Sequence, residues 1–184
     1  EQLPAWINFD AATRTLSGMP PLNFNGDITL QVQVSDGSVT TVKPLSLNVA
    51  AVNDAPVIGS LPVVTTSEDE TFAVVLEQAL LSDVDGNTLT VDVFAANGAA
   101  LPSWLNFDAA TRTLSGTPPL NFNGVVDLQV AVSDGTITIV KPWSVTVVAV
   151  NDAPTLADLP VFETAEDTNF NMTLDSALFT DVDG

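Results

Sequence analysis

The feature that most constrains this chain is an internal repeat with a period of 98 residues. Residues 3–26 return as residues 101–124 with three differences in 24 positions. Three shorter segments return at the same offset: Asn-Asp-Ala-Pro at 53–56 and 151–154, Glu-Asp at 68–69 and 166–167, and Asp-Val-Asp-Gly at 83–86 and 181–184. A period of domain size predicts a tandem array of modules, each with its own core.

The Asn-Asp-Ala-Pro segments mark the expected module boundaries. Asn-Asp followed by proline interrupts regular structure and favours an extended chain, as in a short linker. A turn inside a domain is the alternative, but recurrence at the module period favours a linker. We therefore expect the C-terminal part of one module in residues 1–53, a complete module in 54–152 and the N-terminal part of a third in 153–184, all within a longer protein.

Alternating apolar and polar residues predict strands. Every second residue from 126 to 132 is valine or leucine, and residues 72–76 and 89–93 alternate in the same way. Ser133-Asp134-Gly135-Thr136 predicts a hairpin turn with Gly135 at positive φ, and residues 78–81 predict a single helical turn. About seven short strands per module predict an all-β fold of tandem, antiparallel β-sandwiches of the Ig or cadherin type.

The composition excludes several kinds of function. The chain carries 23 acidic and 4 basic residues, a net charge of −19, which argues against binding to nucleic acid or to an anionic membrane surface. It contains no cysteine and no histidine, so thiolate and imidazole chemistry are excluded. The remaining metal ligands are carboxylate, amide and carbonyl oxygens, which suit hard cations and Ca²⁺ above all.

Many of the acidic residues stand in expected turns and linkers, as in Asp83-Val84-Asp85. In an extended Asp-x-Asp both carboxylates point to one side. Two such charges about 4–5 Å apart repel by roughly 1 kcal/mol in water, and a divalent cation reverses the sign of that energy. An ordinary acidic turn is the alternative, because Asp and Gly both favour turns. Recurrence beside an Asn-Asp linker favours a cation site.

These segments resemble the cadherin-like repeats of the dystroglycan type and of bacterial surface adhesins. The resemblance covers essentially the whole chain, and it is carried by residues 107–118, by Val132-Ser133-Asp134-Gly135 and by the linkers 52–56 and 150–154. It implies that Ca²⁺ is held at each module junction. The residues that match the family's ligands are Asn53, Asp54, Glu68 or Asp69, Asp83, Asp85, Asp134, Asn151 and Asp152, with Asp181 and Asp183 as the repeat of the Asp-x-Asp pair.

The chain departs from the cadherin pattern at one place. Where cadherins carry an acidic pair after Pro-Leu, this chain has Asn121 and Asn123, and likewise Asn23 and Asn25. Amides can ligate calcium, but affinity falls with the number of charged ligands. We therefore expect fewer or weaker calcium ions at each junction than in cadherins.

Three classes of function remain to be compared. The first is a calcium-rigidified spacer or adhesive segment of a large extracellular protein at the cell surface, with further modules or a surface polysaccharide as partner. The second is a carbohydrate-binding module, with Trp143 as an exposed stacking platform, although a lone strand Trp more often lies in the core. The third, an enzyme, is disfavoured because the acids recur in each module and no Gly-x-Ser-x-Gly elbow is present.

The two outer parts of the chain suggest a further partner. Residues 1–50 lack the first strands of a module and residues 155–184 lack the last ones, so each would expose strand edges and half a core. We expect the N-terminal part of one molecule to pair with the C-terminal part of another, in a strand-exchanged homodimer. Disorder of both parts is the alternative.

Overall fold

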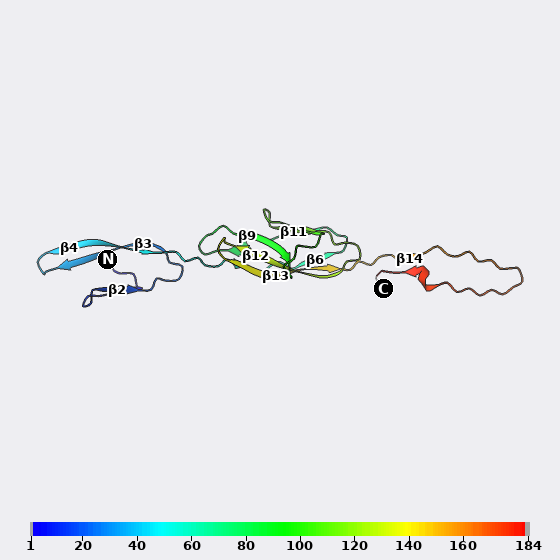
Figure 1. Ribbon diagram of the computed structural model, residues 1–184, viewed down its shortest axis with the longest axis horizontal. Coiled ribbons are helices and arrows are strands. Elements are labelled where there is room, and N and C mark those ends of the chain that lie inside the picture. The colour runs from blue at the N-terminus through cyan, green and yellow to red at the C-terminus, as the bar shows by residue number, and fades with distance from the viewer. Residues whose placement is uncertain (1, 183–184) are drawn as a thin grey trace.

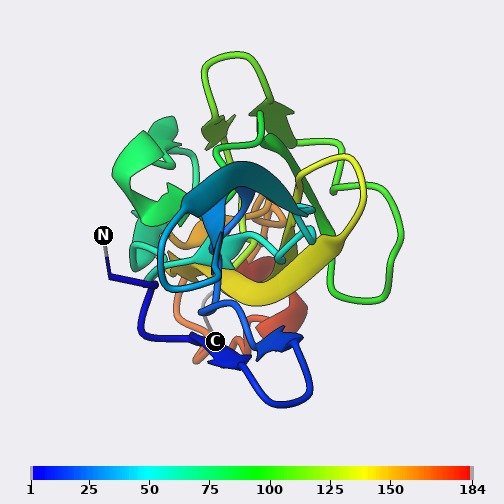
Figure 2. The ribbon, with the colours of Figure 1, turned by 90° about the vertical axis from the view of Figure 1, so that its left-hand side faces the viewer.

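The computed structural model describes residues 2–182, and its strands are arranged along one long axis (Figure 1). We call residues 2–53 the N-terminal segment, 54–152 the central module and 153–182 the C-terminal segment. Figure 2 views the chain along the long axis, with the N-terminal segment in front. The predicted all-β fold is confirmed. No helix among the described residues is long and apolar enough to cross a membrane.

The central module is a sandwich of two sheets. The larger sheet has the strand order β6 (Val64–Ser67), β13 (Thr138–Val148), β12 (Gly124–Ser133), β9 (Thr90–Ala95). The smaller sheet has the order β10 (Leu105–Asp108), β11 (Thr113–Gly116), β7 (Phe72–Val75). All these pairs are antiparallel except β13 with β6, which is parallel. A short pair joins β5 (Val57–Ile58) to β8 (Leu81–Ser82), which follows the 3-10 turn η1 (Gln78–Leu80).

The core lies between the two sheets of the central module. Leu128, Val130 and Val132 alternate along β12 and are at most 1% exposed, and Leu114 on β11 is fully buried in the same cluster. The alternation that predicted this strand is therefore confirmed. Trp143 also belongs to the core, because it is 7% exposed and its indole N–H donates to the carbonyl oxygen of Pro62 at 2.7 Å. The prediction of an exposed stacking platform at Trp143 is wrong.

One pair of strands was not predicted from the sequence. The two-residue strands β5 and β8 have too few residues to show an alternating pattern, so only tertiary pairing reveals them. The turn expected at Asp83-Val84-Asp85 is present, because the Asp83 carboxylate accepts the Asp85 N–H at 2.9 Å and Gly86 follows at φ +74°. The extended Asp-x-Asp arrangement, with both carboxylates on one side, is therefore not formed. The hairpin turn at 133–136 is as predicted, with Gly135 at φ +94°.

The outer segments repeat elements of the central module at the same 98-residue offset. In the N-terminal segment, β1 (Ile7–Asp10) pairs with β2 (Thr15–Gly18) and β3 (Gly26–Ser35) pairs with β4 (Thr40–Val49), as β10 to β13 do. In the C-terminal segment, β14 (Thr155–Leu156) pairs with β15 (Phe179–Thr180) after the 3-10 turn η2 (Ser176–Leu178), as β5, β8 and η1 do. Residues 157–175 of this segment form no strand.

Candidate metal centres at the two junctions

The first junction lies where the N-terminal segment meets the central module, and Asn53 is its centre. The Asn53 side-chain amide donates to Asp134 Oδ2 at 2.9 Å, and its Oδ1 accepts from the Asn87 amide at 2.9 Å. The next linker residue, Asp54, donates its backbone N–H to Asp85 Oδ2 at 2.7 Å. Three segments distant in sequence therefore meet here, and the linker lies directly on the central module.

The turn after β8 supplies Asp83 to this junction. Asp83 Oδ1 accepts the backbone N–H groups of Asp85 at 2.9 Å and of Asn87 at 3.4 Å, so the carboxylate closes its own turn. The other oxygen, Oδ2, is buried and has no hydrogen-bond partner. Because ionised carboxylates are acceptors only, this oxygen needs a donor or a cation.

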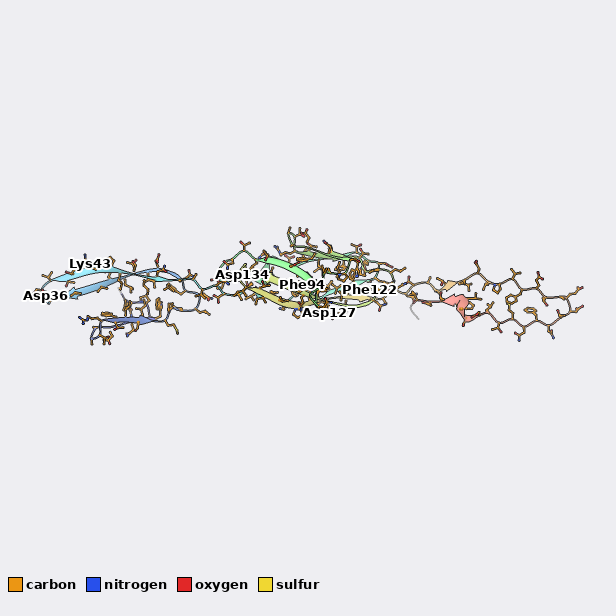
Figure 3. The ribbon with its side chains drawn as sticks, viewed as in Figure 1. Asp36, Lys43, Phe94, Phe122, Asp127 and Asp134 are labelled. Atoms are coloured by element: carbon orange, nitrogen blue, oxygen red, sulfur yellow. The ribbon has the colours of Figure 1, made fainter. Side chains whose placement is uncertain are left out.

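The hairpin after β12 supplies Asp134, and Figure 3 shows this residue at the end of the central module that faces the N-terminal segment. Asp134 Oδ1 accepts the backbone N–H groups of Thr136 and Ile137, both at 2.6 Å. The Ile137 N–H first, and then the Asn53 amide, hold the pKa of Asp134 below its ordinary value of 3.8. These hydrogen bonds thus favour the charged form of Asp134 at the junction.

The N-terminal segment contributes amides to the same place. A pocket at the first junction is lined by Asn23 and Asn25 from the turn before β3, together with Asp54 and Asp85. Asn23 has φ +62°, a left-handed conformation that asparagine tolerates better than most residues. Residues with amide and carboxylate side chains from two successive units therefore line one pocket, together with apolar residues such as Phe24 and Val52.

The second junction lies where the central module meets the C-terminal segment, and Glu68 is its buried acid. Glu68 follows β6, is 3% exposed, and accepts the Val150 N–H on Oε1 at 2.8 Å. Its Oε2 is buried without a hydrogen-bond partner. Asp69, beside it, donates its backbone N–H to the Pro118 carbonyl at 3.1 Å. The labelled Phe122 lies toward this end of the central module in Figure 3.

A pocket at the second junction resembles the pocket at the first. Asn121, Asp152 and Asp181 line it, and Asn121 and Asp152 are the repeats of Asn23 and Asp54. Asn151 donates its side-chain amide to the Asp152 carbonyl at 2.8 Å, as Asn53 does to the carbonyl of Asp54. One hydrogen bond of the first linker is thus repeated in the second.

The structure therefore divides the sequence-predicted ligands into two groups. The first junction holds Asn53, Asp54, Asp83, Asp85 and Asp134. The second holds Glu68, Asp69, Asn121, Asn151, Asp152 and Asp181. Asn123 is exposed just before β12, and Asp183 lies outside the described residues.

Sequence reasoning missed Asn87 as a member of the first junction. The signal for it was its place four residues after Asp83, where its backbone N–H closes the same turn and its amide then meets the linker. Acidic side chains alone do not form a metal cage, because no group of three or more in residues 2–182 is arranged to hold an ion. Any cation must therefore also take oxygens from amides or from the backbone, as Ca²⁺ does.

Two atoms distinguish these junctions from the rest of the described chain. Asp83 Oδ2 and Glu68 Oε2 are the buried side-chain polar atoms that lack a hydrogen-bond partner in residues 2–182. Each belongs to a different junction, and each is a carboxylate oxygen. Buried polar atoms without partners are rare in proteins, and an unseen ion is one of the few physical explanations. The donor set at both junctions fits a hard, oxygen-binding cation.

Comparison with protein families identifies the module type. The family model He_PIG, described as "Putative Ig domain", matches residues 1–50 and, separately, residues 55–148. The chain belongs to this Ig-domain family. The first He_PIG match ends one residue after β4 and the second ends with β13, so the Asn-Asp linkers lie outside both matches. The two He_PIG matches thus comprise the strands of the N-terminal segment and of the central module, and the linker residues Asn53, Asp54, Asn151 and Asp152 lie outside them.

Solved structures give more distant similarities. The endo-fucoidan hydrolase MfFcnA4 of glycoside hydrolase family 107 is 26% identical with a TM-score of 0.43, covering 81% of this chain and 23% of that one. The human desmocollin-1 ectodomain is 17% identical with a TM-score of 0.39, covering 82% and 32%. Drosophila OTK extracellular domains 3–5 are 14% identical with a TM-score of 0.40, covering 80% and 47%. This chain thus spans less than half of each of these proteins. The comparison with curated proteins gave no match.

Proposed function

We propose that this chain is a calcium-binding, non-catalytic segment of a large extracellular adhesin, in which Ca²⁺ stiffens the junctions between cadherin-like modules at the cell surface. The observation that carries this proposal is the pair of buried, unpartnered carboxylate oxygens, Asp83 Oδ2 and Glu68 Oε2, one at each junction. Asn53, Asp54, Asp85 and Asp134 lie at the first junction, and Asp152 lines the pocket at the second.

The electrostatics of the chain support a cation at the junctions. With a net charge of −19, the chain repels itself, and the depressed pKa of Asp134 keeps one of the junction charges in place. A cation that took ligands from both the linker and the module would neutralise this repulsion. Its binding and the order of the junction would then be one linked equilibrium, so that calcium stabilises the aligned modules.

The chemistry of the ligands favours Ca²⁺ over other cations. The chain has no cysteine or histidine, which leaves oxygen donors alone, and Ca²⁺ accepts about six to eight of them in flexible geometry. Mg²⁺ requires a stricter octahedral arrangement and retains several waters. Because amides replace acids at Asn121 and Asn123, we expect weak sites, which are filled at the millimolar calcium concentrations outside cells.

Calcium should raise the melting temperature of the 184-residue chain. For sites with a dissociation constant of about 10⁻⁴ to 10⁻³ M, 10 mM Ca²⁺ stabilises by about 1.4–2.7 kcal/mol per site. In a chain of 184 residues, at about 2–4 °C per kcal/mol, that corresponds to roughly 3–11 °C per site. Differential scanning calorimetry in Ca²⁺ against chelator measures it, with Mg²⁺ at equal ionic strength as the control. Coincident melting curves in all three buffers would contradict the proposal.

Substitution of the two unpartnered carboxylates should remove most of that response. Asp83→Asn and Glu68→Gln keep the size of each side chain but delete one negative charge at one junction each. Glu77→Gln is the matched control, because Glu77 is exposed and its side chain makes no cap hydrogen bond before η1. Calorimetric titration with Ca²⁺ should show one site lost or weakened about tenfold or more in each junction variant, and none in the control. Equal calcium binding by all three variants would disprove the assignment.

A further inference from the structure

The side chain of Asn53, in the first linker, is held at both ends of its amide group. Its Nδ2 donates to Asp134 Oδ2 at 2.9 Å and to the Asp54 carbonyl oxygen at 3.0 Å. Its Oδ1 accepts from the Asn87 side-chain amide at 2.9 Å. All of these groups lie on residues 53–134, and the Asn53 side chain is half-buried, where hydrogen bonds are stronger than in bulk water. Two distant parts of the central module therefore fix one linker side chain.

The carboxylate of Asp134 decides which way the Asn53 amide faces. Asp134 Oδ1 already accepts the backbone N–H groups of Thr136 and Ile137, and Oδ2 faces the linker (Figure 3). Because an ionised carboxylate can only accept hydrogen bonds, the NH2 end of Asn53 must point toward it. The carbonyl oxygen of the Asn53 amide is thereby turned away from Asp134 and toward Asn87.

Asn87 supplies the donor that this carbonyl oxygen requires. Its backbone is set by the turn after β8, because its N–H donates to Asp83 Oδ1 at 3.4 Å and Gly86 before it has φ +74°. Its side-chain amide then reaches Asn53 Oδ1. An aspartate at position 87 would have almost the same shape but no donor when ionised. It would place two acceptor oxygens against each other and add a negative charge at the junction.

We propose that Asn87 is a positioning residue that holds the first linker on the central module through the hydrogen-bond relay Asp134–Asn53–Asn87, whether or not a cation is bound. Each member of the relay is satisfied by protein groups, so the relay does not require an ion. It also leaves Asp83 Oδ2 without a hydrogen-bond partner, so it does not use the buried oxygen assigned above to calcium. The relay thus goes beyond the proposed function and does not depend on it.

The backbone N–H of Asp54 reports whether the relay is formed. Asp54 follows Asn53 directly, and its N–H donates to Asp85 Oδ2 at 2.7 Å. This contact needs the linker to lie on the turn after β8, where Asn87 also holds it. If the Asn53 side chain is released, the linker should open more often and its N–H should exchange faster with solvent.

Asn87→Asp tests the donor at position 87, with Asn97→Asp as the matched control. Both variants add one negative charge. Asn97 is exposed and accepts the Ala99 N–H on its Oδ1 at 3.0 Å, a hydrogen bond that a carboxylate can also accept. Amide hydrogen exchange is followed by NMR in chelator. Exchange of the Asp54 N–H should become about tenfold or more faster in Asn87→Asp, and should change by less than about twofold in the control.

A swap of donor and acceptor tests the direction of the relay. Asn53→Asp alone places two carboxylates against each other and should accelerate exchange of the Asp54 N–H about tenfold or more. Adding Asp134→Asn returns a donor from the opposite side, while Asn87 can still donate to the new carboxylate. The double variant should therefore recover to within about threefold of the unsubstituted chain, since only the hydrogen bond to the Asp54 carbonyl is not restored. A role of side-chain bulk alone predicts no such recovery, because Asn and Asp have nearly the same size.

The unsubstituted chain keeps the test valid if a variant folds poorly. In chelator its Asp54 N–H should exchange at least about tenfold more slowly than in the chain unfolded by urea. Lack of this protection, equal exchange in Asn87→Asp and Asn97→Asp, or no recovery in the double variant would each overturn the proposal. Because every measurement is made in chelator, none of these results depends on whether the junctions bind calcium, and a failure of the calcium proposal would leave them unchanged.

Discussion

Replacement of Leu114 by alanine should destabilise the central module by about 2–5 kcal/mol, the range for a fully buried leucine. Leu114 is 0% exposed and lies on β11, where its register partners are Phe107 on β10 and Val74 on β7. Truncation removes buried methyl groups and leaves a cavity that two paired strands cannot close by a small movement. Urea denaturation followed by tryptophan fluorescence in a Trp6→Phe background measures the loss, because the two remaining tryptophans, Trp104 and Trp143, both lie in the central module.

Leu16→Ala is the matched control for this prediction. Residues 11–18 and 109–116 are identical in sequence, and both leucines lie on the second strand of a pair, but Leu16 is only half-buried. Because no third strand pairs with β2 in residues 2–182, Leu16→Ala should change the unfolding transition of the central module by less than about 0.5 kcal/mol. If Leu16→Ala and Leu114→Ala lowered the free energy of unfolding equally, burial by neighbouring strands would not explain the stability contributed by Leu114.

Gly116→Ala should destabilise the central module by about 3 kcal/mol, at the upper end of the usual overpacking range. A Cβ at this position would collide with the carbonyl oxygen of Trp104, and would also lie 3.1 Å from a methyl carbon of Leu105. The carbonyl cannot easily retreat, since it accepts the Thr117 N–H at 3.3 Å and Leu105 is paired in register with Gly116. Alanine can adopt the backbone conformation here, so the cost is steric.

Ser115→Ala serves as the control for Gly116→Ala, because it changes the neighbouring residue of the same strand. Ser115 is half-buried and pairs with Ala73, and a methyl group in place of its hydroxyl adds no new contact to β10. Its melting temperature should stay close to that of the unsubstituted protein, within the effect of about 0.5 kcal/mol typical of such positions. A melting temperature for Gly116→Ala as high as that of Ser115→Ala would contradict the predicted collision.

The candidate ligands were predictable from sequence as residue types but not as two groups. Turn chemistry and the repeat identify Asp83, Asp134 and the Asn-Asp linkers without any structure. Glu68 lies at the end of the central module opposite Asp83. Only the parallel pairing of β6 with β13 explains this position, because it places Glu68 beside Val150. Asn87 was missed for a related reason, since its contact with Asn53 joins residues 34 apart.

Local sequence alone determined the longer strands, the hairpin turn at Gly135 and the module period, because alternation and turn preference act between residues a few positions apart. The tertiary structure decided which side chains are buried, and identical segments make this plain: Leu16 and Leu114 have the same neighbours in sequence, yet only Leu114 is fully covered. It also placed Trp143 in the core, against Pro62. Burial and hydrogen-bond partners are set by strands that meet from distant parts of the chain, and no local pattern contains that information.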